Sequence, residues 1–370
     1  MIVTMKAGAS KEQIDHVIAV IEECGYKAHP IFGSNLTVLA AVGDERGKSG
    51  VFERLSSQPG VGKVEYILPP YKLVCREIAP GLEREATVVR VRIRHKGGIT
   101  GRAIGDGRLS VIAGPCSVES LEQVMTCARE ARKYGATFLR GGAFKPRTSP
   151  YSFQGLAEDG LKILAEAREE YGLGIVTELM DAHNLDLVTK YADIIQIGAR
   201  NMQNFMLLKN LGDTNRPILL KRGMASTIDE LLMSAEYVVS CGNPNVILCE
   251  RGIRTFETAY RNTLDLNAVP ALRAATHLPI IVDPSHGTGR WELVKPMSLA
   301  AVAAGADGLI IEIHPEPSKA FSDGQQSLKP EKFGELMDAV AAVARCVGKP
   351  PCWEDETESA TEGAVPDCLK

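Results

Sequence analysis

The chain has 370 residues, of which 45% are apolar and 24% are charged, and this composition suits one large globular domain plus a smaller one. Its net charge of −4, without a concentrated basic run, argues against a nucleic-acid partner, and the lack of any run of about 18 apolar residues argues against a membrane-spanning helix. The nine cysteines show no CxxC spacing and the first residues, MIVTMKAGAS, lack the features of a signal peptide, so we expect a cytoplasmic protein with free thiols.

Residues 1–75 are predicted to form a small βαββαβ unit of the ferredoxin-like kind. MIVTMK has the alternation of a short strand, and KEQIDHVIAVIEECG has the spacing of a helix that Ser10 can cap and Gly25 can end. YKAHPIFG and LTVLAAVG follow as strands, VFERLSSQ as a weaker helix, and VGKVEYILPP as a closing strand. The unit contains no cluster of catalytic residue types, so the chemistry is expected further along the chain.

Residues 76–108 are predicted to be a connecting segment with one strand-like run, TVVRVRI. The glycines after this run could suggest a loop that holds a phosphate group. Their spacing matches neither GxGxxG nor the P-loop, and no helix follows directly, so we interpret them as turn residues. These glycines are Gly97, Gly98, Gly101, Gly105 and Gly107.

From residue 109 to residue 348, a strand-then-helix alternation repeats eight times. The strands are predicted to be LSVIAGPC, ATFLRGGA, GIVTELM, DIIQIG, PILLKRG, VILCERG, PIIVDPS and GLIIEIH. They are short and apolar on both faces, as strands of a buried parallel sheet are. The count and size predict an α/β fold, a (β/α)8 barrel. A doubly wound sheet is the alternative, but it usually has fewer strands, and no glycine-rich dinucleotide turn follows the first strand.

The last residues, 349–370, are polar, acidic and proline-containing. Such a composition does not support a packed core, so we expect a disordered or loosely attached tail.

Charged side chains follow all eight predicted strands, where barrels of this type place their active sites. The cationic members are Arg140, Lys145, Arg147, Arg200, Lys221, Arg222 and Arg251. So many positive charges at one mouth repel one another unless anions lie among them. Because Arg and Lys are the usual residues that bind phosphates and carboxylates, the set predicts more than one phosphorylated or carboxylated ligand.

Four metal-capable side chains are expected at the same mouth, namely Cys116, His286, Glu312 and Asp323. A mixed sulfur, nitrogen and oxygen site suits Mn, Fe, Co or Zn better than Mg or Ca, and such an ion can polarise a carbonyl group. The spacing alone also leaves purely structural roles open, in which Cys116 is a small buried thiol and His286 is a hydrogen-bonded loop histidine. His314 competes as a ligand, but Pro315 ends its strand, so we place it behind the ligands.

The chain also closely resembles a known family, the 3-deoxy-D-arabino-heptulosonate 7-phosphate (DAHP) synthases of the bacterial type I beta form, which carry an N-terminal ferredoxin-like regulatory domain. The resemblance covers about residues 1–348 and rests on the motifs GPCSVE, LRGGAFKPRTSPYSFQG, QIGARNMQN, LLKRG, CERGIRTFE, DPSHGTG and IEIHPEP…SDGQQSL. It implies condensation of phosphoenolpyruvate with erythrose 4-phosphate, the first step toward aromatic amino acids. It further implies a homotetramer and feedback by tyrosine or phenylalanine.

The resemblance assigns roles to individual residues. It implies that one divalent metal ion is held by Cys116, His286, Glu312 and Asp323. It implies that phosphoenolpyruvate is bound by Arg140, Lys145, Arg200, Lys221 and Arg251. It implies that erythrose 4-phosphate is held by the KPRT stretch, which is Lys145, Pro146, Arg147 and Thr148. The candidate catalytic residues are the metal ligands Cys116 and His286, together with Lys145, which we expect to transfer a proton to the aldehyde oxygen.

Two alternative functions remain open. A 3-deoxy-D-manno-octulosonate 8-phosphate synthase would share the barrel and the phosphoenolpyruvate chemistry, but its counterpart of KPRT reads KANRSS-like, so KPRTS argues against it. A non-catalytic amino-acid sensor built on the N-terminal unit need not keep all four metal ligands and the full cationic set. The acidic tail departs from the family pattern and has no predicted role.

Overall fold

A computed structural model describes residues 1–32, 36–43, 50–65, 70–79, 82–145, 149 and 151–354. The chain divides into two compact units, Met1–Lys72 and Leu73–Lys370. The division lies close to the domain boundary predicted after residue 75. Within the described ranges, no helix is both long enough and apolar enough to cross a membrane.

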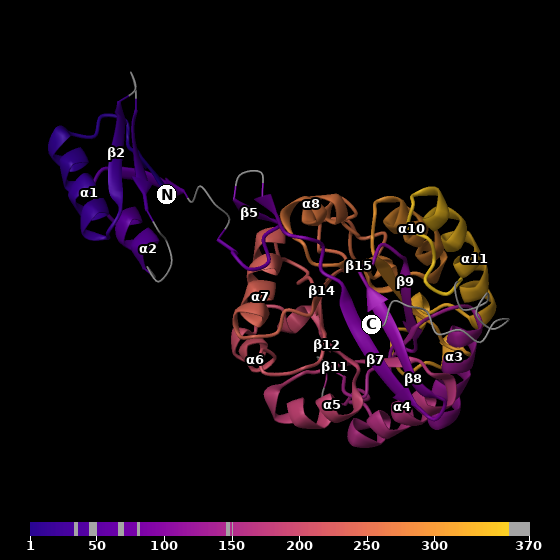
Figure 1. The fold of residues 1–370 in the computed structure, drawn as a ribbon. Helices are drawn as coiled ribbons and strands as arrows, with labels where there is room; N and C mark the ends of the chain where they lie inside the picture. Colours follow the sequence, from indigo (N-terminus) through magenta and orange to yellow (C-terminus); the bar gives the residue numbers. More distant parts are fainter. Residues whose placement is uncertain are drawn as a thin grey trace. The chain divides into compact units, whose positions relative to one another are not determined.

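The first unit is a four-stranded antiparallel sheet with two helices (Figure 1). Its strands β1 (Ile2–Met5), β2 (Lys27–Phe32), β3 (Thr37–Val42) and β4 (Val61–Glu65) are ordered β2-β3-β1-β4, and its helices are α1 (Lys11–Glu23) and α2 (Val51–Ser56). Ser10 begins α1 through a reciprocal capping box with Gln13, and the apolar side of α1 buries Val17 and Ile21 completely. This order and connectivity confirm the predicted ferredoxin-like unit.

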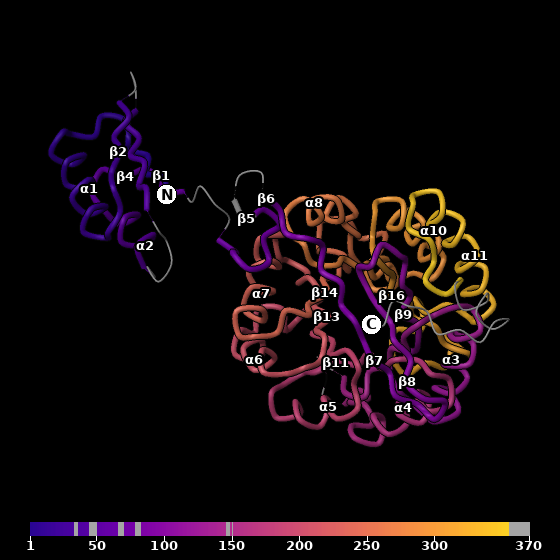
Figure 2. The backbone as a smooth tube through the Cα atoms, in the orientation of Figure 1, coloured from indigo at the N-terminus to yellow at the C-terminus, as the bar shows by residue number. Residues whose placement is uncertain are grey.

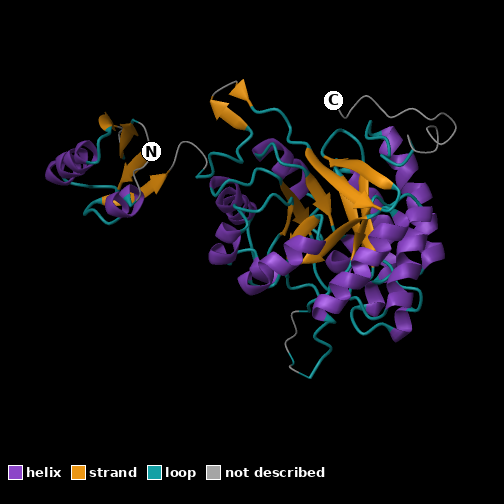
Figure 3. Ribbon diagram, turned by 60° about the horizontal axis from the view of Figure 1, so that its bottom comes forward, coloured by secondary structure: helices purple, strands orange, loops and turns teal. Residues whose placement is uncertain are grey.

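The second unit is a closed barrel of parallel strands with helices around it, as Figure 3 shows. The strands are β9 (Ser110–Gly114), β10 (Phe138–Arg140), β11 (Gly174–Glu178), β12 (Ile194–Ile197), β13 (Ile218–Lys221), β14 (Val246–Glu250), β15 (Ile280–Val282) and β16 (Gly308–Glu312). The helices are α3 (Leu121–Lys133), α4 (Ala157–Tyr171), α5 (Leu185–Tyr191), α6 (Phe205–Asn210), α7 (Ile228–Ser240), α8 (Ala268–Ala275), α9 (Pro284–Thr288), α10 (Trp291–Ala303) and α11 (Pro330–Cys346). The tube in Figure 2 can be followed around the barrel in chain order. Each predicted strand is present and β16 pairs with β9, which confirms the predicted (β/α)8 barrel.

An antiparallel hairpin of β7 (Val89–His95) and β8 (Gly98–Ile104) covers the barrel at the amino ends of its strands. Its buried face, including Val91 and Ile93, packs into one apolar cluster with inward residues of all eight barrel strands. The interpretation of the glycines after TVVRVRI as turn residues is wrong for Gly98 and Gly101, which lie in β8. Pairing with β7 satisfies the backbone of β8 and outweighs the low strand propensity of glycine. A shorter hairpin, β5 (Glu77–Ala79) and β6 (Leu82–Glu83), precedes it.

The first residues of the predicted tail are attached to the barrel. Lys349 forms an ion pair with Asp307 at 2.6 Å, and the backbone N–H of Cys352 donates to the carbonyl oxygen of Leu109 at 3.1 Å. The side chain of Trp353 packs against Gly135, where an added Cβ would lie 2.5 Å from the indole ring. The expectation of a loose tail therefore does not hold for residues 349–354, and residues 355–370 lie outside the described residues.

Candidate active site

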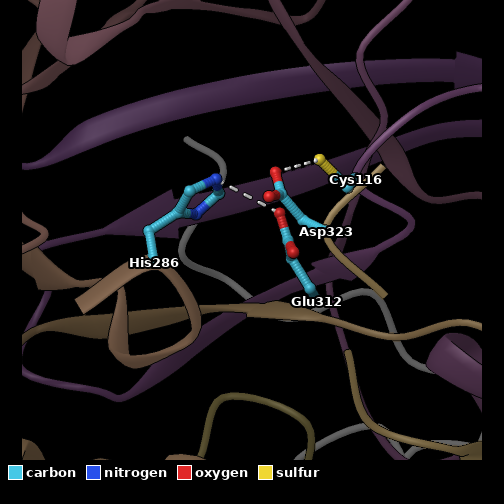
Figure 4. A group of neighbouring side chains, drawn as sticks. All are labelled: Cys116, His286, Glu312 and Asp323. Atoms are coloured by element: carbon cyan, nitrogen blue, oxygen red, sulfur yellow. Dashed lines mark hydrogen bonds and ion pairs between the residues drawn. The ribbon is translucent and has the colours of Figure 1, made fainter. Parts of the chain in front are cut away.

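Four metal-capable side chains from distant parts of the sequence meet at the carboxyl ends of the barrel strands (Figure 4). Cys116 follows β9, His286 lies in α9 directly after β15, Glu312 ends β16, and Asp323 lies in the loop beyond β16. One ligand atom from each residue lies within 4.8 Å of the others. The barrel closure makes this possible, because β16 and β9 are neighbours and Glu312 is in register with Gly114.

Asp283 sets the orientation of His286. One Asp283 oxygen, Oδ1, accepts from the backbone N–H of His286 at 2.9 Å and so begins helix α9. The other, Oδ2, accepts from Nδ1 of the His286 ring at 2.7 Å and from the ammonium of Lys221 at 2.5 Å. Because a carboxylate only accepts, Nδ1 carries a proton, and Nε2 points at a carboxylate oxygen of Glu312 3.3 Å away. Burial lowers the pKa of His286, which favours the neutral imidazole that binds metal ions.

Glu312 is fully buried and has a partner on each oxygen. Its Oε1 accepts from Nη1 of Arg140 at 2.5 Å and lies near His286, while Oε2 accepts from the side-chain amide of Gln326 at 2.8 Å. Burial raises the pKa of Glu312, but the neighbouring His286 and Arg140 outweigh burial and hold the pKa below its usual value. The site therefore presents a buried carboxylate rather than a carboxylic acid.

The Cys116 thiol lies between several polar partners. Its Sγ is 3.1 Å from Nζ of Lys145, 3.2 Å from Oδ2 of Asp323 and 3.3 Å from Oγ of Ser322. Burial, followed by the charge of Glu312, raises the pKa of Cys116 to about 11, so the thiol is protonated at neutral pH in the metal-free protein.

Asp323 is held in the left-handed region of backbone space, with φ at +52°. A non-glycine residue in this region costs about 1 to 2 kcal/mol, so the surrounding loop must impose the conformation. Burial raises the pKa of Asp323, but His286 and Arg261 outweigh burial and lower the pKa to about 2. The four groups thus offer a thiol, a neutral imidazole and two carboxylates, a donor set that fits a borderline divalent ion.

A cavity of about 140 Å³ opens beside these four residues. Five predicted cations line it, namely Arg140, Lys145, Arg200, Lys221 and Arg251. In the part of the chain that the structure describes, Arg200 and Arg251 form no ion pair with a carboxylate, although Arg251 is only 4% exposed. Burial lowers the pKa of Arg251, as expected for a desolvated cation. A cavity lined by two arginines without an ion-pair partner in the described residues suits anionic ligands.

Not every predicted cation belongs to this cavity. Arg222 points elsewhere and forms ion pairs with Glu250 at 2.9 Å and Asp265 at 2.8 Å. Its assignment to the cationic mouth is therefore wrong, because Arg222 neutralises two carboxylates of its own. Pro146, Arg147 and Thr148 lie outside the described residues.

His314 is not among the four clustered side chains, and its Nε2 lies 3.5 Å from a carboxylate oxygen of Glu119.

Three polar residues of the site were missed from the sequence. Ser322 contacts Cys116, Gln326 holds Glu312, and Arg261 forms an ion pair with Asp323 at 3.1 Å. Gln326 and Ser322 lie in the same SDGQQSL motif as Asp323, so their proximity to Asp323 in the sequence was a signal that could have identified them. Arg261 lies well beyond the end of β14 in an irregular loop, and no local pattern marks it.

Comparisons with known proteins point to one family. The chain matches the DAHP synthetase I family over residues 89–346 and the DAHP synthase ferredoxin-like domain over residues 1–69. It is 50% identical over 348 residues to the phospho-2-dehydro-3-deoxyheptonate aldolase of Thermotoga maritima, an alignment that covers 94% of this chain and 99% of that protein. A crystal structure of this Thermotoga maritima aldolase matches with a TM-score of 0.87 at 49% identity, covering 95% of this chain and 98% of that one.

Two further matches bear on function and domain structure. A truncated form of the Thermotoga maritima DAHP synthase matches with a TM-score of 0.67 at 49% identity, covering 76% of this chain and 99% of that one. A 2-dehydro-3-deoxyphosphooctonate aldolase of Citrifermentans bemidjiense is 30% identical over 271 residues, covering 68% of this chain and 98% of that protein.

Proposed function

The chain belongs to the DAHP synthetase I family, and we propose that it condenses phosphoenolpyruvate with erythrose 4-phosphate at the mouth of its barrel with the help of one divalent metal ion. Its activity is that of a DAHP synthase, an enzyme of aromatic amino acid biosynthesis. The observation that carries the metal proposal is the meeting of four metal-capable atoms within 4.8 Å beside a cationic cavity.

Cys116, His286, Glu312 and Asp323 would hold the ion. The donor set supports this assignment, because the imidazole is held neutral and both carboxylates stay ionised by their surroundings. An ion bound there would supply a Lewis acid beside the aldehyde carbonyl of erythrose 4-phosphate.

The cations of the cavity would hold phosphoenolpyruvate. Arg200 and Arg251, which have no carboxylate partner within the described residues, would bind its phosphate. Arg140 and Lys221 are each paired with a buried carboxylate. They would add positive charge to the cavity and help to position phosphoenolpyruvate. The KPRT residues Pro146, Arg147 and Thr148 would hold erythrose 4-phosphate, since they directly follow Lys145, which reaches Cys116.

The proposed reaction forms one carbon–carbon bond and releases phosphate. C3 of phosphoenolpyruvate forms a bond to the aldehyde carbon, and the aldehyde oxygen takes a proton from Lys145, whose Nζ lies 3.1 Å from Sγ of Cys116. Water adds at C2 and loses one proton, which restores the proton that Lys145 gave up. The new C2 hydroxyl passes its proton to the phosphate as the bond from C2 to the phosphate oxygen breaks, which leaves a ketone at C2. The arginines around the phosphate stabilise the charge that develops as it departs.

An assay of phosphate release from phosphoenolpyruvate tests this proposal and its rivals. We expect release with erythrose 4-phosphate and a fall of about 10³-fold after metal removal by a chelator, because Lewis-acid polarisation contributes several kcal/mol. Added Mn²⁺ or Co²⁺ should restore the rate. Equal turnover with arabinose 5-phosphate would support the octulosonate synthase activity of the 30% identical relative instead. No turnover with either aldose at full metal loading would favour the amino-acid sensor.

The ferredoxin-like unit is proposed to be a regulatory domain that responds to tyrosine or phenylalanine. The residues that line the cavity all belong to the second unit. A truncated form of the Thermotoga maritima DAHP synthase has a solved structure that matches 76% of this chain, which supports independent folding of the barrel.

Removing residues 1–72 should therefore leave an active enzyme that neither amino acid inhibits. The cut should fall after Lys72, because the backbone N–H groups of Leu73 and Val74 donate to the carboxylate of Glu236 in the barrel. The measurement is the rate of DAHP formation by both proteins across a tyrosine and a phenylalanine titration. A truncated enzyme that is still inhibited would place the effector site in the barrel.

We also propose a homotetramer in the cytoplasm. The tetramer rests on the family resemblance, and sedimentation velocity of the full chain tests it. The eight cysteines of the described ranges are all free thiols, which fits a reducing compartment.

A further inference from the structure

We propose that Arg261 and Gln326 are a positioning pair that selects which oxygen of each carboxylate ligand faces the metal ion. This inference rests on the proposed metal site and deepens it. Neither residue is one of the four ligands, and each contacts a ligand directly.

The pair forms a continuous chain of contacts from Asp323 to Glu312, and Arg261 also lines the cavity. Nη1 of Arg261 donates to Oδ1 of Asp323 at 3.1 Å and to the side-chain oxygen of Gln326 at 2.7 Å. The side-chain amide nitrogen of Gln326 donates in turn to Oε2 of Glu312 at 2.8 Å. One oxygen of each carboxylate, Oδ1 of Asp323 and Oε2 of Glu312, thus accepts a hydrogen bond from the pair.

The remaining oxygens face the cluster. Oδ2 of Asp323 lies 3.2 Å from Sγ of Cys116, and Oε1 of Glu312 lies 3.3 Å from Nε2 of His286 and also accepts from Nη1 of Arg140 at 2.5 Å. With Oδ1 and Oε2 engaged by the pair, Oδ2 and Oε1, which each have a second lone pair, are the oxygens left for the ion. The pair therefore favours one-oxygen binding by both Glu312 and Asp323 over two-oxygen binding.

The surroundings hold the pair in place. Gln326 has no exposed surface and closes the short 3₁₀ turn Gly324–Gln326 that directly follows Asp323. Arg261 donates its backbone N–H to the carbonyl oxygen of Thr288 at 3.0 Å. Its stem lies against Gly289, where φ is +70° and an added Cβ would lie 2.3 Å from the Cβ of Arg261. Thr288 ends α9, the helix that carries His286. The contacts of Arg261 therefore connect His286, Asp323 and, through Gln326, Glu312.

Electrostatics and positioning predict opposite effects on metal affinity. Arg261 is a cation next to a site for a divalent cation, so its charge alone weakens metal binding. Replacing it by an uncharged residue would then strengthen binding if charge were its only influence. If Arg261 acts by fixing Asp323 and Gln326, the same replacement should weaken binding, and changes of this kind in residues that orient ligands typically cost about 10- to 100-fold in metal affinity.

The test compares the metal affinity of apoenzymes by calorimetric titration with Co²⁺, and the absorption spectrum of the Co²⁺ forms. We expect Arg261→Met and Gln326→Leu each to weaken Co²⁺ binding by about 10- to 100-fold and to shift the Co²⁺ bands. The double variant should lose much less Co²⁺ affinity than the product of the two single-variant losses, because both residues act through one chain of contacts. Arg254→Met, which removes an exposed arginine from the same loop, is the matched control and should bind like wild type.

Two results would overturn the inference. Unchanged or tighter Co²⁺ binding by Arg261→Met, with an unchanged spectrum, would show that Arg261 does not position Asp323. Normal binding by Gln326→Leu would show the same for Glu312. If wild-type apoenzyme bound no Co²⁺ at all, the proposed metal site itself would fail, and the wild-type titration separates that result from the other two. Because Arg261 is partly exposed, its variant is expected to fold even if Gln326→Leu is destabilised.

Discussion

The Cys116→Ala enzyme is expected to lose at least about three orders of magnitude in DAHP formation while remaining folded. The loss follows from removal of one of the four proposed metal ligands, since a Lewis acid at the site would contribute several kcal/mol and each 1.36 kcal/mol is worth about tenfold in rate. Folding should change little, because the buried thiol is neutral in the metal-free protein, where its pKa is raised to about 11. Loss of one sulfur atom from the interior typically costs about 1 kcal/mol.

Thermal unfolding with and without metal separates the two effects. Wild type at a metal concentration of about 100 times Kd should gain about 2.7 kcal/mol of stability, and Cys116→Ala should gain almost none. Cys127→Ala is the matched control, since Cys127 is equally buried but lies on α3, with its thiol directed at the carbonyl oxygen of Ile313. A Cys116→Ala enzyme with full activity and a normal metal response would remove this residue from the ligand set.

Replacing Arg251 and Arg222 by Met should have opposite consequences, although the two residues look alike in the sequence. Arg251→Met is expected to lower kcat/KM for phosphoenolpyruvate by about 10²- to 10³-fold, because truncating one member of a buried charged contact costs about 2 to 4 kcal/mol. Its free energy of unfolding should be unchanged or raised, since the variant removes a buried cation that has no ion pair within the described residues.

The Arg222→Met variant should instead lose stability. It would leave the fully buried carboxylate of Glu250 without its ion-pair partner, which typically costs about 3 to 5 kcal/mol. Urea unfolding and steady-state kinetics on both variants provide the comparison. An Arg251→Met enzyme that loses stability but keeps its KM for phosphoenolpyruvate would contradict the assignment of Arg251 to the phosphate.

The different outcomes for these two arginines show where sequence patterns stop being informative. Short apolar runs predicted all eight barrel strands, because strands buried on both faces have a strong apolar signal. The closure that makes β16 and β9 neighbours then brought Cys116 and Glu312 to the same mouth. Whether an arginine faces the cavity or a carboxylate of its own depends on partners far away in sequence. Asp265, the second partner of Arg222, is one of these.

Arg261 and strand β8 were missed for related reasons. Arg261 is placed by its contact with Gly289 and by the backbone of Thr288, neither of which leaves a local pattern. The glycines of β8 have low strand propensity, and only their pairing with β7 over the floor of the barrel makes them a strand. Both features depend on tertiary contacts rather than on local sequence.

Anomalous diffraction from crystals of the full chain grown with Mn²⁺ tests the central proposal most directly. We expect one strong peak about 2.0 to 2.4 Å from four atoms, namely Sγ of Cys116, Nε2 of His286 and one oxygen each of Glu312 and Asp323. A peak at another place in the barrel would contradict the assignment of the metal site. Full activity of enzyme shown to be metal-free would contradict metal dependence itself.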